Sequence, residues 1–240
     1  MANFVLTDTQ VYVHAYDLTT HTNQVSVNTE VETVDNTTFG GNGYRSRRAG
    51  LRTVEAEVSG YHDADPDAEG FTELGVVDRV VTVAADGEGS TAFAFHAGNF
   101  NYSTLGAIGE MNPFSISMQG TNATGVVRGA LAKGPGSVAN GSTGVKGVGV
   151  NLGAGGAGKR LYIAAHVFTA GTSLSLDVRQ STTSGGTYTA IEDFELNSVT
   201  IAGGQWVSFD ASSGVTGPWY KIGVSAITGA FDFAVTLAIQ

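Results

Sequence analysis

Hydrophobic and polar residues alternate along most of this chain, most regularly on the two sides of a polar segment near residue 40. The hydrophobic positions that this period places on one face are Val25, Val27, Val31, Val54 and Val58. A period of two is typical of a β-strand that is covered on a single face. The pattern therefore predicts one long hairpin over residues 30–60, with a polar loop at its tip and these valines in the core.

The same period recurs in short runs along the rest of the chain, and Gly-rich turns separate the runs. The further strands expected in the first half contain Val11 and Val13 and then cover residues 80–84, 91–96, 114–119 and 126–132. Those expected in the second half cover residues 161–167, 174–178, 207–209, 220–224 and 231–239. Short strands joined by glycine turns are typical of antiparallel sandwiches.

A single short helix is expected after the hairpin, over residues 65–75. Asp65 stands directly before Pro66, acidic residues follow, and Gly75 supplies a stop. Proline is favoured in the first turn of a helix, and acidic side chains there interact favourably with the helix dipole. The predicted fold class is therefore all-β with one short helix.

The chain is predicted to divide at a Gly/Ser-rich run. Residues 133–149 contain a proline and no hydrophobic period, which is typical of a linker. Residues 1–132 would then form one antiparallel β-sandwich, and residues 150–240 a second β-sandwich. An echo between residues 36–41 and 181–186 leaves an internal duplication open, although turn chemistry alone also produces such echoes.

Charge is unevenly distributed along the 240 residues, whose formal net charge is −10. Residues 1–130 hold 16 acidic and 6 basic side chains, whereas residues 131–240 hold 6 of each. An acidic surface repels phosphate, which disfavours a protein that grips nucleic acid and suits one that lets it pass. Cysteine is absent, so disulfides and thiolate chemistry are excluded. Without a signal-peptide pattern or a run of 18 apolar residues, we expect cytoplasmic folding and no membrane contact.

Segments that resemble catalytic or binding motifs each lack a required residue. Residues 153–160 satisfy the GxGxxG spacing, but Arg160 stands where a phosphate-binding loop needs Ser or Thr, and a strand pattern follows. Residues 63–74 space their acids as a calcium loop does, but Ala68 and Leu74 replace the required Gly and Glu. The five histidines show no metal-ligand spacing, and no GxSxG elbow is present. We therefore expect no enzyme, no catalytic residues, no cofactor and no bound metal.

The hairpin tip holds glycines followed by a cluster of arginines. Residues 34–40 read VDNTTFG, an Arg-rich segment follows, Gly50 to Arg52 opens the second strand, and Ser59 to Tyr61 closes it. This order of features resembles the signature region of the major tail tube proteins of long-tailed, siphovirus-type bacteriophages. The resemblance covers roughly the first half of the chain.

The resemblance implies a β-sandwich subunit that forms hexameric rings, which stack into a tube around a lumen for genome passage. It implies an inter-ring loop made of Thr37, Thr38, Phe39, Gly40, Gly41, Arg45, Arg47 and Arg48. It implies inner-wall strands that carry Glu30, Glu32, Glu55 and Glu57. The implied partners are further copies of the chain, other tail proteins such as the tape measure and tail terminator, and DNA that passes without specific binding. The implied location is the virion, after assembly in the host bacterial cytoplasm.

Other interpretations stay open because the second half is larger than a tube fold requires. It is either an outer decoration or a duplicated tube domain, and duplication would give trimeric rings with pseudo-sixfold symmetry. The main alternative function is an adhesion module that recognises carbohydrate through Tyr188, Trp206, Trp219 and Tyr220, although core and turn packing also explains these aromatics. A capsid decoration protein is the third interpretation.

Overall fold

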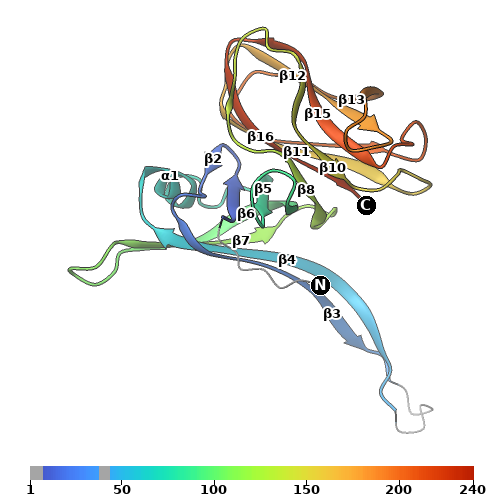
Figure 1. Ribbon diagram of the computed structural model, residues 1–240. Coiled ribbons are helices and arrows are strands. Elements are labelled where there is room, and N and C mark those ends of the chain that lie inside the picture. The colour runs from blue at the N-terminus through green and yellow to red at the C-terminus, as the bar shows by residue number, and fades with distance from the viewer. Residues whose placement is uncertain (1–7, 38–43) are drawn as a thin grey trace.

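The computed structural model describes residues 8–37 and 44–240. The strands of these residues form two antiparallel sheets (Figure 1). The larger sheet contains β1 (Gln10–Val13), β2 (Tyr16–Asp17), β3 (Thr22–Asp35), β4 (Arg47–Tyr61), β5 (Arg79–Ala84), β6 (Thr91–Thr104), β7 (Pro113–Gly120), β8 (Val127–Lys133), β9 (Ser137–Val138), β11 (Arg160–Thr169), β14 (Gly203–Asp210) and β16 (Phe231–Ile239). The smaller sheet contains β10 (Gly144–Asn151), β12 (Ser173–Ser181), β13 (Thr189–Val199) and β15 (Trp219–Thr228). This arrangement confirms the predicted all-β antiparallel fold.

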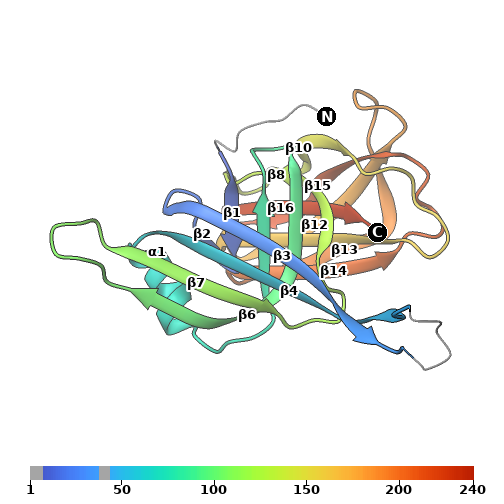
Figure 2. The ribbon, with the colours of Figure 1, turned by 90° about the horizontal axis from the view of Figure 1, so that it is seen from below.

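The predicted hairpin is formed by β3 and β4, which pair from Thr22 opposite Gly60 to Asp35 opposite Arg47. β4 also pairs with β7, and β7 pairs with residues 97–104 of β6. We call these four strand segments the front sheet, which is seen face on in Figure 2. The first part of β6 pairs with β5 and β8 instead, so this one strand connects the front sheet to the body of the protein.

The first hydrophobic core lies between the front sheet and β1, β5 and the first part of β6. Val54 and Val58 are buried as predicted, and Val25 and Val27 are half-buried against the same cluster. The prediction for Val31 is wrong, because 43% of its surface is exposed. Figure 1 shows the reason: the distal part of the hairpin projects past the body, where no second layer of described residues faces it.

The two halves of the chain share the larger sheet. β8 pairs with β16, β16 pairs with β11, and β11 pairs with β14. β11 is buried on both faces, since Leu161 and Ile163 pack toward the smaller sheet while Tyr162 and Ala164 pack against Val80 of the first half. The sequence period identified only the first of these two faces.

His166 of β11 is fully buried between the two halves. Its Nε2 lies 2.9 Å from Oγ1 of Thr82, and its Nδ1 lies 3.0 Å from the carbonyl oxygen of His14. Burial lowers the pKa of His166 to about 4, so the imidazole is neutral at neutral pH. A carbonyl can only accept, so Nδ1 carries the proton and Nε2 accepts from the threonine hydroxyl.

The core of the second sandwich lies between β14, β11 and β16 on one side and the smaller sheet on the other. Its largest fully buried side chains include Leu161, Ile163, Tyr220, Phe231 and Phe233. The Phe194 and Phe209 rings, from β13 and β14, have centroids 4.8 Å apart and link the edges of the two sheets. The expected second sandwich is therefore present.

Residues 133–149, which the composition predicts as a linker, contain β9 and most of β10. These strands pair with β16 and β15. Lys133 is buried, and its Nζ donates to the carbonyl oxygens of Gly134 at 2.8 Å and of Phe233 at 2.7 Å. The segment thus adds strands to the second sandwich, while the division of the chain into two domains stays a prediction.

The helical segment after the hairpin begins earlier than predicted. α1 (Ala64–Asp67) continues into a π-helical turn, η1 (Ala68–Thr72). Asp63, not Asp65, caps the helix, because its carboxylate accepts a hydrogen bond of 2.8 Å from the next backbone amide. η1 ends at Thr72 with Glu73 as its C-cap, three residues before the predicted stop at Gly75. Gly75 lies in the turn that follows, at a φ of 83°, a conformation that favours glycine.

Candidate assembly surface

The outer face of the front sheet carries rows of polar side chains that cross its four strands. The rows are Gln24, Ser59, Ser115 and Ser103; Ser26, Glu57, Ser117 and Asn101; and Asn28, Glu55, Gln119 and Gly98. Residues directly opposite each other in antiparallel strands lie on the same face. These rows therefore combine two carboxylates with small neutral groups, and they contain no cation.

The acidic residues predicted for an inner wall fall on or near this face. Glu55 and Glu57 are exposed in the outer rows, as the period of β4 predicts. Glu30 is exposed opposite Thr53 and extends the rows toward the hairpin tip. Glu32 is also exposed, but it lies where the pairing register of β3 and β4 shifts. Their role as an inner wall stays a prediction.

Two hollows on this face are small. Their volumes are about 130 and 140 Å³, both are lined by Glu55 and Gln119, and the second is lined by Arg52 as well. Sites for small molecules typically measure about 300–1,000 Å³ and are mostly apolar. The face therefore offers a broad polar surface, without the enclosed apolar volume that a small-molecule site needs.

The projecting part of the hairpin, residues 30–37 and 44–53, is called the arm below. Its exposed large hydrophobic side chains are Val31, Val34, Tyr44 and Leu51. Tyr44 and Leu51 are 82% and 76% exposed. Its exposed cations are Arg45, Arg47, Arg48 and Arg52. Exposed apolar groups gathered on a projecting element are typical of a protein–protein contact.

Hydrogen bonds tie the two strands of the arm together close to its tip. The backbone amide of Asn36 donates to the carbonyl oxygen of Ser46 at 3.0 Å, and the Ser46 amide donates to Oγ1 of Thr37 at 2.9 Å. Thr37 donates to the Asp35 carboxylate through its hydroxyl and its amide, which lowers the pKa of Asp35. The arm is therefore paired up to residues 36 and 46.

The predicted inter-ring loop is only partly described by the structure. Thr37, Arg45, Arg47 and Arg48 lie exposed at the distal end of the arm. Thr38, Phe39, Gly40 and Gly41 lie outside the described residues. Arg47 stands opposite Asp35 and Arg48 opposite Val34 in the strand register. Contact with another ring stays a prediction for all eight residues.

A second exposed hydrophobic surface, called the helix patch below, lies around the end of the helical segment. Its members are Phe71, Leu74, Val76, Val77 and Phe100, each at least 40% exposed. The Gly75 amide donates to the carbonyl oxygen of Asn99 at 2.7 Å, which brings the connection after η1 beside Phe100 of β6. The helix and the arm lie at opposite ends of the front sheet (Figure 1).

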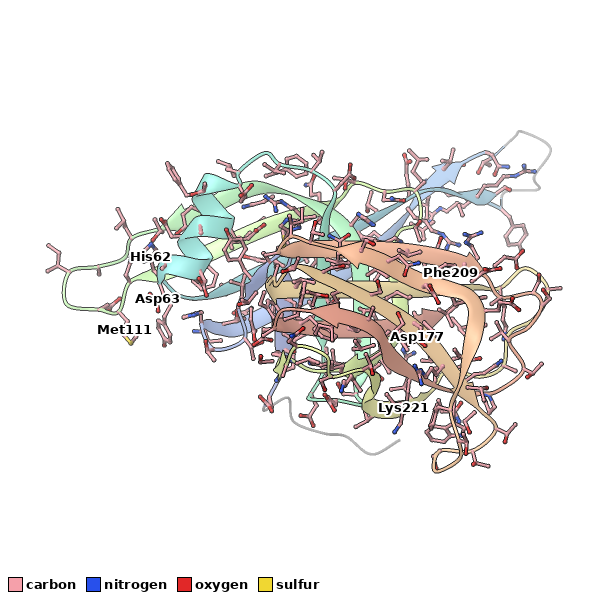
Figure 3. The ribbon with its side chains drawn as sticks, turned by 90° about the horizontal axis from the view of Figure 1, so that it is seen from above. His62, Asp63, Met111, Asp177, Phe209 and Lys221 are labelled. Carbon is pink, nitrogen blue, oxygen red and sulfur yellow. The ribbon has the colours of Figure 1, made fainter. Side chains whose placement is uncertain are left out.

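Acidic residues accompany the helix patch. Asp63 and Asp65 are exposed on the helical segment, and Asp67 and Glu73 are partly exposed. Figure 3 shows Asp63 and His62 at this end of the molecule, and Met111 on the projecting loop between β6 and β7. This surface was not predicted from the sequence, although four of its five hydrophobic residues stand within seven positions, 71–77, without a strand period.

Buried polar groups hold the helical segment against β6. The Asn99 side chain donates to the carbonyl oxygens of Glu69 at 3.0 Å and of Gly70 at 2.9 Å. Glu69 is fully buried, and burial raises the pKa of its carboxyl group to about 8, so it is protonated at neutral pH. Arg79, itself buried, forms an ion pair with Glu73. These contacts fix the position of the helix patch.

The motif-like segments are occupied by structural contacts. In residues 153–160 the amides of Gly155 and Gly156 donate to carbonyl oxygens of Val215 and Ala211, at 3.1 and 2.9 Å. They therefore cannot also cradle a phosphate, and β11 follows at Arg160 as the pattern predicted. Within residues 8–37 and 44–240, no three His, Asp or Glu side chains are placed to hold a metal ion.

The aromatic residues considered for carbohydrate binding do not form one platform. Trp206 packs against His96 and Tyr162, with ring centroids 4.8 and 5.7 Å away, at the junction of the two halves. Tyr220 is fully buried. Tyr188 lies beneath the ammonium group of Lys221, at 4.9 Å from the ring centroid. Packing therefore accounts for most of these side chains.

In the part of the chain that the structure describes, no helix has the length and apolar character that a membrane crossing requires.

Sequence comparisons give no relative, since no family model and no curated protein matches the chain. Among solved structures, a chain from the virion of a native gene transfer agent particle has a TM-score of 0.41 and 19% identity, covering 48% of this chain and 92% of that chain. The SPP1 Dit (gp 19.1) protein, described as a hub adsorption apparatus of phages that infect Gram-positive bacteria, has a TM-score of 0.37 and 10% identity, covering 97% and 99%. A chain of the phage p2 baseplate in its activated conformation has a TM-score of 0.29 and 10% identity, covering 95% and 97%. Scores this low establish neither a shared fold nor a shared function.

Proposed function

We propose that this chain is a structural subunit of a bacteriophage tail, and that its copies assemble into rings that stack into a DNA-conducting tube. The observation that supports the proposal most is the front sheet. It combines an outer face whose polar rows are anionic and contain no cation with two strand edges that have no partner within the described residues. The resemblance of the hairpin region to major tail tube proteins leads to the same function from the sequence.

The two edges of the front sheet favour assembly through neighbouring copies. β3 pairs only with β4 in the described chain, and residues 101–104 of β6 pair only with β7. Long unpaired edges promote uncontrolled association, which a closed ring of subunits removes by pairing every edge. In such a ring β3 of one copy meets β6 of the next, and the front sheets line the lumen.

The charge of the outer face suits a DNA conduit. Glu55 and Glu57 repel phosphate, and the rows offer no Lys or Arg to which DNA would bind. Serine, asparagine and glutamine side chains keep the face hydrated without adding positive charge. The second sandwich lies on the opposite side of the front sheet, and we place it on the outside of the tube (Figure 1).

Electron microscopy of the concentrated protein, combined with sedimentation, tests this function. We expect closed rings or hollow tubes of uniform width. Sixfold symmetry would correspond to one tube unit per chain, whereas threefold symmetry would correspond to a duplicated unit. A protein that stays monomeric at high concentration would contradict the proposal and favour the adhesion module, which glycan-binding assays would then examine.

A variant with a shortened arm serves as the control. Replacing residues 33–49 by Asn-Gly leaves the buried part of the hairpin in place, because Val54 and Val58 lie outside the replaced segment. If the arm connects rings, this variant forms rings that do not stack. Unchanged tubes from the shortened protein would contradict the inter-ring role of the arm.

A further inference from the structure

We infer that the arm of one copy docks on the helix patch of a second copy in the adjacent ring. This inference rests on the proposed function and names the surface that receives the arm. Both surfaces are exposed in the single chain, and both combine large apolar side chains with charge. The arm carries four arginines and three acidic residues, Glu30, Glu32 and Asp35, and therefore has a net charge of +1, whereas the exposed charged residues around the patch are acidic. This difference in sign is the observation that commits each surface to the other.

The positive charge of the first half is concentrated on the arm. Of the 6 basic residues in residues 1–130, four are on the arm: Arg45, Arg47, Arg48 and Arg52. A fifth, Arg79, is buried and paired with Glu73. The strand register places Val31 opposite Arg52 and Val34 opposite Arg48, so each exposed valine has a cation beside it.

The negative charge lies beside the helix patch. Asp65 on α1 and its N-cap residue Asp63 are exposed, and 65% of the Asp63 side chain is accessible. Asp78 is exposed directly after Val77 at the other side of the patch. The guanidinium groups of the arm can approach these carboxylates while Leu51 covers Phe71 and Leu74.

The geometry requires two copies. Figures 1 and 2 show the arm at one end of the front sheet and the helix at the other, so an arm cannot reach the patch of its own chain. The contact is therefore heterologous, and it repeats without closing on itself between two molecules. Its direction follows the strands, whereas the unpaired strand edges face sideways. Edge pairing therefore closes a ring, and the docking of the arm on the patch stacks one ring on the next.

Apolar burial and charge have separate roles in this contact. Removing Leu51, Phe71 and Leu74 from water supplies affinity. The exposed ion pairs contribute less affinity but select the orientation and the partner. High salt should therefore slow stacking more than it weakens tubes that have already formed.

Cross-linking between introduced cysteines tests the contact directly, because the chain contains no native cysteine. The variant carries Leu51→Cys on the arm and Phe71→Cys on the patch, and a flexible bismaleimide is added after assembly. We expect a ladder of covalent oligomers on a denaturing gel. The control pairs Leu51→Cys with Ile201→Cys, a residue of the second sandwich that is 67% exposed and thus equally reactive. The control should give no ladder.

The outcomes separate this inference from the proposed function. Rings or tubes without a ladder, or an equal ladder from the control, overturn the docking of arm on patch and leave the tail function standing. A protein that neither assembles nor forms a ladder overturns both.

A complementary pair of charge variants adds a second readout. Arg48→Glu and Asp65→Arg should each stack poorly alone, and an equimolar mixture should recover stacking because a junction between the two variants joins opposite charges. A mixture that stacks no better than either variant also overturns the docking.

Discussion

Nε2 of His166 on β11 lies 2.9 Å from Oγ1 of Thr82 on β5, so a buried hydrogen bond joins the second half of the chain to the first. The same ring donates through Nδ1 to the carbonyl oxygen of His14. Both contacts require a neutral imidazole that donates at one nitrogen and accepts at the other. The junction between the halves is therefore sensitive to protonation.

We expect acid to destabilise the protein through this histidine. The folded pKa of His166 is about 4, below its ordinary value of 6.5, so the unfolded chain binds the extra proton first. Stability that is complete above pH 6.5 is therefore lost as pH falls toward 4. The loss attributable to His166 should be about 2–3 kcal/mol of unfolding free energy.

Urea denaturation of the wild type and of His166→Gln, at pH 7 and at pH 4.5, measures this effect. The variant is less stable at pH 7, because Gln cannot reproduce both hydrogen bonds, but its stability should fall less between the two pH values. An equal fall in both proteins would show that His166 does not contribute to the acid sensitivity.

Glu69 should give the opposite dependence on pH. Its folded pKa is raised to about 8, from an ordinary value of 4.5, so the folded protein holds a proton that the unfolded chain releases. Its contribution to stability is largest below pH 4.5 and is lost as pH rises toward 8. Glu69→Gln keeps the shape of the side chain without its ionisation. At pH 8.5 we expect the unfolding free energy of this variant, measured by urea denaturation, to exceed that of the wild type by about 2–4 kcal/mol. No gain at pH 8.5 relative to pH 5 would contradict the buried, protonated state.

The two hairpin valines Val58 and Val31 should respond differently to the same substitution. Val58→Ala removes two buried carbon atoms and should cost about 2 kcal/mol, since Val58 is fully buried. Val31→Ala should change stability by less than about 0.5 kcal/mol, because this residue is exposed on the arm. Thermal denaturation of both variants measures the difference. Equal losses would mean that the arm folds back against the body in solution.

The outer face of the front sheet should determine whether assembled particles retain DNA. Glu55→Lys combined with Glu57→Lys converts the only two charges of its polar rows to cations. If the face lines a lumen, particles of this variant should retain DNA that resists nuclease, and wild-type particles should not. Glu192→Lys with Glu195→Lys adds the same charge on exposed positions of the second sandwich and should hold only nuclease-sensitive DNA. Equal protection in both variants would contradict an inner position of the front sheet.

Much of the fold is predictable from local periodicity. The hairpin strands, the exposed positions of Glu55 and Glu57, and most strands of the second half follow from alternation alone. β10 and β13 were not predicted, because bulges and residues with left-handed backbone conformation interrupt their alternation. Examples are Gly147 at φ 65° and Asp193 at φ 64°. A period of two also cannot tell whether a second layer covers a strand. It therefore predicted a buried Val31 and did not predict the second buried face of β11.

The candidate surfaces divide in the same way. The exposure of Glu55 and Glu57 follows from the alternation of β4, whereas the rows also need the pairing of β4 with β7 and of β7 with β6, which alternation does not specify. The helix patch depends on how the segment after η1 meets β6 through Asn99, a contact between residues far apart in sequence. Its exposed hydrophobic residues are visible in the sequence, but exposure is a property of the folded chain.

The larger sheet, which both halves of the chain share, also constrains when the protein can complete its fold during synthesis. β16, which pairs with both β8 and β11, follows every other strand in sequence. A nascent chain that still lacks residues 231–239 thus leaves a gap between its two halves, with His166 and the adjoining core open to water. The subunit reaches its mature shape only after the ribosome has translated β16. If the chain assembles as proposed, polymerisation waits until synthesis of these strands is complete.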